Sequence, residues 1–236
     1  MPSSIDKNDV DISKLFSWNK KYTIEVNKDE YNIYIRLVGD AELNRARVYA
    51  LRKSAEMRKK LKDENSDERL AYLPSIENLD KDAIINGLTL MNTKKFTAEA
   101  MREIKFNLPK EPNSESPLEE KEKYQEEIDS FPKVRDLEIK NYVKERLEEK
   151  IKELKAKSKE VLFDEYLKGL VEQVCESEML TAFREMCTFF GSYKDKEFKH
   201  RLLDNFEDFQ NLPAEIKSQL IDNYISLEID FDTLKK

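Results

Sequence analysis

Residues 134–191 read VRDLEIKNYVKERLEEKIKELKAKSKEVLFDEYLKGLVEQVCESEMLTAFREMCTFFG. The run contains no proline and only one glycine, Gly169, before the final Gly191, so it predicts one or two long helices. In its first half the apolar residues recur every three or four positions, at Ile139, Val143, Leu147, Ile151 and Leu154. Such a narrow stripe indicates a helix that contacts one neighbour, as in a coiled coil or at the edge of a bundle.

From Val161 onward the same run is apolar around most of its circumference. We interpret this part as the centre of a C-terminal core, although a surface rich in Met and Phe also suits an adaptable binding groove. Further on, Pro213 stands in the first turn of a last segment with a regular apolar face. This segment predicts a terminal amphipathic helix that packs on the long helix.

Two short strands are expected near the N-terminus, where YTIEV (22–26) and YNIYIRLVG (31–39) flank the turn-like NKDE (27–30). Their alternation puts Ile33 and Ile35 on one face, with Ile24 matching them on the partner strand. A lone hairpin is only marginally stable in water. The hairpin should therefore pack on a helix or join another sheet.

Residues 41–62 give the strongest helical pattern of the N-terminal half. The apolar and small residues of one seam are Leu43, Ala46, Ala50, Ser54, Met57 and Leu61. These steps of three and four predict a helix with one buried seam. Its other faces are mostly basic: they carry eight Arg and Lys residues against two glutamates, Glu42 and Glu56.

The expected fold is mainly α, with a small N-terminal β-hairpin plus helices followed by a C-terminal helical bundle with one long helix. The clearest linker is PKEPNSESP (109–117), which holds three prolines and no large apolar residue, and an acidic run follows it. We therefore expect an N-terminal module at 1–108, an acidic Pro/Ser linker with a short helix at 109–131, and a C-terminal helical domain at 132–236.

The composition argues against a catalytic centre. Charged residues make up 39% of the chain and the net charge is −7, but there is one histidine, His200, and only four glycines. His200 has no second histidine or cysteine at metal-ligand spacing, and no GxxxxGK[ST] or GxGxxG loop could cradle a phosphate. We therefore expect a non-enzymatic protein without a cofactor or a metal site.

The apolar runs and the two cysteines indicate the compartment and the redox state of the protein. The sequence has no run of about 18 apolar residues and no apolar N-terminal signal segment, so we expect an intracellular protein that does not enter a membrane. Cys175 and Cys187 stand about three helical turns apart, too far for a disulfide on one helix. They are expected to be buried thiols.

Two sets of residues are candidates for binding partners. The first set, Leu15, Phe16 and Trp18, consists of large apolar residues in an otherwise polar N-terminal arm (1–21). The second set, Arg45, Arg52 and Lys59, consists of basic residues spaced seven positions apart on the basic helix. The arm could dock on its own domain or on a neighbour, and the basic helix could be a solvated face, meet acid elsewhere in the chain, or meet another subunit. The partner could also be a second copy of the chain, which would make the protein a homo-oligomer.

Nucleic-acid binding through the basic helix 41–62 is the alternative function. A basic helix can neutralise phosphates, and such binding weakens steeply with salt. However, no aromatic or Gly-rich element is interleaved to stack bases, and the chain is acidic overall. Contact with other proteins is therefore the preferred interpretation.

Two stretches resemble segments of tailed-bacteriophage morphogenesis proteins, especially tail assembly chaperones and small virion components. They are GDAELNRARVYALRKSAEMRKKL (39–61) and FEDFQNLPAEIKSQLIDNYISLEIDFDTLKK (206–236), with its aromatic pair, LP step and acidic ending. The resemblance covers about a quarter of the chain. It implies a protein without catalytic residues that binds phage tail or baseplate subunits in the host cytoplasm and could stay in the virion.

Overall fold

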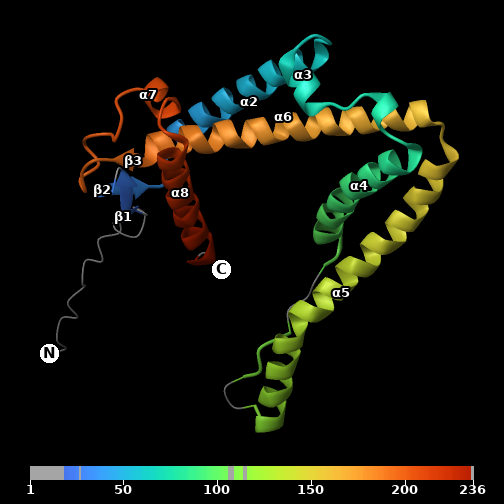
Figure 1. Cartoon of the computed structure of the whole chain (residues 1–236). Coiled ribbons are helices and arrows are strands. Elements are labelled where there is room, and N and C mark those ends of the chain that lie inside the picture. Colours follow the sequence, from blue (N-terminus) through green and yellow to red (C-terminus); the bar gives the residue numbers. More distant parts are fainter. Residues whose placement is uncertain (1–18, 27, 106–108, 114–115, 235–236) are drawn as a thin grey trace. The chain divides into compact units, whose positions relative to one another are not determined.

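The computed structural model describes residues 19–26, 28–105, 109–113 and 116–234 (Figure 1). Most of these residues are helical and the described strands form one small antiparallel sheet, so the predicted mainly α fold class is confirmed. In chain order the elements are β1 (Asn19–Val26), β2 (Asp29–Arg36), α2 (Asp40–Lys62), α3 (Asp67–Tyr72), the 3-10 helix η1 (Ile76–Asn78), α4 (Lys81–Glu103), α5 (Leu118–Ala156), α6 (Lys159–Gly191), β3 (Ser192–Tyr193), α7 (Phe206–Gln210) and α8 (Ala214–Leu234).

The predicted hairpin exists and joins a third strand. β1 and β2 pair antiparallel, with Tyr22 opposite Ile33, and β2 also pairs with β3, with Tyr34 opposite Tyr193. The strand order is β1-β2-β3. Because β3 has only two residues, it has no alternating pattern that a sequence could reveal.

The chain divides into two compact units that differ from the predicted domains. Unit 1 comprises residues 1–63 and 174–236, and unit 2 comprises residues 64–173. The prediction placed boundaries at 109–131, but β2 pairs with β3, which brings both ends of the chain into one unit. In addition, α5 runs unbroken through residue 131 and contains Pro132, so the short linker helix and the long helix are one element.

Unit 1 is built around the end of α6. Its core cluster contains buried residues from the sheet, from the segment between β2 and α2, and from α2, α6, α7 and α8. They are Ile24, Ile33, Ile35, Val38, Ala46, Cys187, Phe189, Phe190, Phe209, Leu220, Tyr224 and Leu227. The predicted terminal helix is confirmed as α8, which follows Pro213 and buries three of its residues here. The side chain of Gln219 on α8 accepts a hydrogen bond from the backbone N–H of Glu25 on β1, at 3.1 Å.

Unit 2 holds the narrow apolar stripe of the long helix. Ile139 and Val143 of α5 are buried against Ala100 of α4, and Leu154 is buried with Ile84 farther along the same pair, so the two helices run antiparallel. This confirms that the stripe packs on a neighbouring helix. The beginning of α6 also reaches α4, because the side chains of Tyr166 and Met91 lie directly against Gly87 and Gly169, respectively.

The interpretation of the later part of the run as core holds for part of its residues. Leu162, Cys175, Cys187, Phe189 and Phe190 are buried. Val161 and Leu180, by contrast, are 48% and 44% exposed. Both cysteines are free and buried, as expected for structural thiols.

Gly191 is a site of close backbone approach that gives the first prediction. A Cβ there would lie 2.6 Å from the carbonyl oxygen of Arg36 and 2.9 Å from the ring of Tyr224. Gly191→Ala should therefore destabilise unit 1 by about 1–3 kcal/mol, the usual range for overpacking. The matched control is Gly39→Ala, because nothing lies within 4 Å of a Cβ at that position. Urea denaturation followed by circular dichroism measures both, and equal midpoints for the two variants would contradict the packing described.

Thiol labelling gives a second prediction. Burial raises the pKa of the Cys187 thiol to about 12, and Cys175 is only 1% exposed. Because the thiolate is the reactive form, neither residue should react with a disulfide reagent at about pH 8 in the native protein. Both should react fully in guanidinium chloride. Fast labelling of the native chain would show that these helices do not pack as described.

Candidate protein-binding surface

The inner side of α2 is fixed by its packing in unit 1. Ala46 and Ala50 are 0% and 2% exposed, and Leu61 is 1% exposed, so the predicted seam faces the interior. At the start of the helix, Glu42 Oε2 accepts a hydrogen bond from the backbone N–H of Gly39 at 3.2 Å. Gly39 is thus the N-cap, and Glu42 satisfies one of the donors that a helix start leaves free.

A cluster of polar side chains holds the start of α2 on the sheet. Glu42 Oε1 accepts hydrogen bonds from Arg36 Nη2 at 3.0 Å and from Arg201 Nη2 at 3.2 Å. Arg36 Nη2 also donates to the Tyr193 hydroxyl on β3, at 2.8 Å. The guanidinium of Arg201 lies 4.9 Å from the centre of the Phe190 ring. We call Glu42, Arg36, Arg201 and Tyr193 the Glu42 cluster.

The opposite side of α2 is exposed and is here called the α2 outer face; it consists of Arg45, Val48, Leu51, Arg52 and Lys59. Val48 and Leu51 are 58% and 60% exposed, so this face presents two large apolar side chains to solvent. By helical spacing the three basic residues lie along one side, about 10 Å apart at each step. The face therefore combines apolar side chains with a row of positive charge.

A hollow of about 340 Å³ lies within this face and is lined by Asn44, Arg45, Val48, Tyr49 and Arg52. Tyr49 makes a firm wall, because its ring contacts Phe206 edge to face at 5.1 Å and its hydroxyl accepts a hydrogen bond from Gln210 Nε2 at 3.0 Å. Burial raises the pKa of the Tyr49 phenol, which therefore stays neutral at physiological pH. The hollow thus has a neutral aromatic wall between two guanidinium groups.

Of the six predicted binding residues, three lie within the described part of the chain. Arg45 and Arg52 line the hollow together, whereas Lys59 is exposed farther along α2 and does not line it. Leu15, Phe16 and Trp18 lie outside the described residues. Val48, Leu51 and Tyr49 were not among the predicted residues, although Val48 and Leu51 are apolar residues that lie off the predicted seam.

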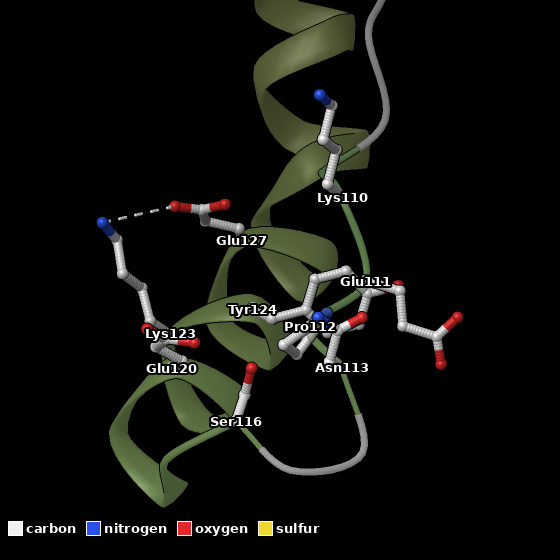
Figure 2. Close-up of a pocket in the computed structure, with 9 residues that line it drawn as sticks. All are labelled: Lys110, Glu111, Pro112, Asn113, Ser116, Glu120, Lys123, Tyr124 and Glu127. Atoms are coloured by element: carbon white, nitrogen blue, oxygen red, sulfur yellow. Dashed lines mark ion pairs between the residues drawn. The ribbon is translucent and has the colours of Figure 1, made fainter.

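A more polar hollow of about 370 Å³ lies in unit 2, where the segment before α5 folds against the first turns of that helix (Figure 2). Lys110, Glu111, Glu120, Lys123 and Glu127 contribute charges of both signs, and Lys123 forms an ion pair with Glu127 at 3.9 Å. Because neither sign predominates and solvent reaches the hollow, it offers no selective site for a cation or an anion.

The described residues offer little for metal binding or for insertion into a membrane. Within 19–26, 28–105, 109–113 and 116–234, no three or more His, Cys, Asp or Glu side chains are grouped to hold a metal ion. His200 Nδ1 lies 3.1 Å from Asp195 Oδ2, which also accepts the backbone N–H of His200 at 2.7 Å, so this pair closes a loop. None of the helices in the part of the chain that the structure describes is both long enough and apolar enough to span a bilayer.

Comparisons with family models, with curated proteins and with solved structures find no match to this chain. Among the described residues, the α2 outer face combines exposed apolar side chains with a row of basic residues.

The Glu42 cluster gives a third prediction. Glu42→Ala removes the acceptor shared by two guanidinium groups and should lower the free energy of unfolding by about 1–3 kcal/mol. The control is Glu56→Ala on the same helix, whose exposed ion pair with Lys53 should contribute less than about 1 kcal/mol. Urea denaturation of the two variants separates these expectations, and a smaller loss for Glu42→Ala than for Glu56→Ala would show that the cluster is not structural.

Proposed function

We propose that this chain is a non-enzymatic protein-binding factor that acts in the assembly of a bacteriophage tail or virion, as an assembly chaperone or as a small structural component. The observation that carries the binding role is the α2 outer face, where exposed Val48 and Leu51 stand between Arg45 and Arg52 on a helix fixed from the other side. Apolar residues within a charged rim are typical of protein interfaces.

The chemistry of this face defines the partner it suits. Positive charge on both sides of the hollow favours an acidic partner surface, and the hollow accepts an apolar side chain beside Val48 and Tyr49. Complementary charge speeds association and selects the partner, while the buried apolar contacts provide most of the affinity. We therefore expect an acidic patch with an apolar residue at its centre on a tail or baseplate subunit.

The phage role comes from the resemblance of residues 39–61 and 206–236 to tail morphogenesis proteins. These segments lie far apart in the sequence but contact each other in unit 1, through Tyr49 with Phe206 and Tyr49 with Gln210. This contact supports reading the two segments as one functional part. In this role the protein would work in the host cytoplasm, and a structural component would remain in the virion.

Co-purification with tail subunits tests the proposal and is the fourth prediction. The full chain should co-elute in size-exclusion chromatography with a tail or baseplate subunit encoded beside it. The triple variant Arg45→Glu/Arg52→Glu/Lys59→Glu should weaken this complex at least about tenfold, because it reverses the charge of the interface. A matched triple variant of exposed residues on α5, Lys133→Glu/Arg135→Glu/Lys152→Glu, should bind as the natural chain does. Elution as an inert monomer beside all of these subunits would contradict the proposal.

Nucleic-acid binding is the second candidate, favoured by the row of basic residues on the same face. Val48→Asp separates the two functions. A protein complex that buries Val48 should be lost, whereas phosphate binding should weaken only modestly because Arg45 and Arg52 remain. Nucleic-acid binding should also disappear between about 50 and 200 mM salt. A gel shift that survives Val48→Asp and vanishes with salt would favour nucleic acid.

A further inference from the structure

A second apolar hollow, distinct from the α2 outer face, lies in unit 2 between α4 and α5. Its volume is about 570 Å³, and it is here called the α4–α5 groove. The lining residues are Thr93, Thr97 and Met101 from α4 and Asp136, Ile139, Lys140, Val143, Lys144, Leu147, Glu148 and Ile151 from α5. The α5 residues from Asp136 to Ile151 span about 22 Å, which is the length of four turns of helix.

The floor and the α4 wall of the groove consist of apolar side chains and of threonine hydroxyl groups that already donate hydrogen bonds. Ile139 and Val143 are each 8% exposed, and Met101 at the edge is 62% exposed. The hydroxyl of Thr93 donates to the carbonyl oxygen of Thr89 at 2.9 Å, and that of Thr97 to the carbonyl oxygen of Thr93 at 2.8 Å. Because both hydroxyl groups bond to their own helix, an apolar occupant would leave neither donor unpaired.

The position of the groove on α4 shows why it is open. The start of α6 packs on α4 at Gly87, where Tyr166 lies, and at Met91, which lies against Gly169. The groove begins after these contacts, at Thr93, and Leu90 on the same side of α4 is 64% exposed. Two antiparallel helices with an apolar groove between them can accept a third helix, which would pack on both of them.

The charges of the α5 rim specify that helix. Lys140 and Lys144 stand one turn apart in the middle of the groove, and Asp136 and Glu148 stand at its ends. Lys144 and Glu148 approach within 4.0 Å but are 74% and 61% exposed, so their mutual attraction is weak and leaves Lys144 able to bind elsewhere. An occupant with carboxylates in its middle complements this rim.

The same charges argue against a second copy of this chain as the occupant. If two grooves met around a central two-fold axis, Asp136 would face Glu148 of the other copy and Lys140 would face Lys144. Each pairing brings like charges together, which opposes association. The groove therefore suits a different molecule.

We propose that the α4–α5 groove binds an amphipathic helix of a partner protein, about four turns long, with an apolar stripe and a pair of acidic residues flanking its middle. The partner helix packs its stripe on Ile139, Val143, Leu147 and Met101, and its carboxylates meet Lys140 and Lys144. This binding is independent of the α2 outer face, so the chain carries two docking surfaces in separate units.

Two synthetic peptides of about 18 residues test this proposal in fluorescence anisotropy with the full chain. Both carry leucines at helical spacing; the probe peptide has glutamates beside the stripe and the comparison peptide has lysines there. The glutamate peptide should bind at least about tenfold more tightly than the lysine peptide. Lys140→Glu/Lys144→Glu should reverse this preference, and exposed Met101→Glu should abolish binding of both peptides.

The controls use exposed residues of α5 that do not line the groove. Lys152→Glu and Val134→Glu match the charge and apolar variants, and neither should change binding. The α2 triple variant should also leave peptide binding intact, which separates this surface from the proposed function. Equal binding of both peptides, absence of binding, or binding that ignores the groove variants would overturn the proposal. A dimer in light scattering that Met101→Glu dissociates would also overturn it, by identifying a second copy as the occupant.

Discussion

The carboxylate of Glu42 joins the end of β2 and the start of α2 to the segment after β3, which lies 159 positions farther along the chain. One oxygen accepts hydrogen bonds from Arg36 at the end of β2 and from Arg201 after β3, and the other accepts the backbone N–H of Gly39 before α2. Charge-assisted hydrogen bonds are stronger than neutral ones, and a shared acceptor fixes all of its donors together. The cluster holds the start of α2, and the buried seam residues Ala46 and Ala50 turn inward, so Val48 and Leu51 lie on the solvent side of the helix.

The pairing of β2 with β3 also explains the organisation of the units. Gly191 lies against the backbone of Arg36 and the ring of Tyr224, and Ser192 and Tyr193 add β3 to the sheet. Residues 64–173 are therefore inserted, in the sequence, between two parts of unit 1. Composition points to linkers where prolines and small polar residues gather, as in 109–117. It does not reveal which distant strands pair, because that depends on contacts between residues that are more than a hundred positions apart.

Periodicity predicted the features that depend on neighbours along the chain. The seam of α2, the stripe of α5 and the terminal helix α8 were all predicted, because a buried helix face repeats every three or four residues. The two-residue strand β3 and the continuity of α5 through Pro132 were not, since a strand so short has no pattern and a proline usually ends a helix. For the candidate site, Arg45, Arg52 and Lys59 were predicted as one row of basic residues, and the first two of them line the hollow. The role of Tyr49 was not predicted, because its contacts come from Phe206 and Gln210 of α7.

The two proposed docking surfaces have a common electrostatic basis, which follows from the net charge of the chain. The chain carries −7 overall, so an acidic partner is repelled by most of its surface. Local positive charge at Arg45 and Arg52, and at Lys140 and Lys144, offsets this repulsion only where the partner is oriented correctly. Each pair of cations stands beside exposed apolar side chains, Val48 in one unit and Met101 in the other. Because charge acts at long range and apolar contact only at short range, orientation comes first and burial then holds the complex. If both proposals hold, an acidic protein would obtain selectivity from lysine and arginine pairs placed beside apolar side chains, and a partner that lacked either the carboxylates or the apolar residue would not be retained.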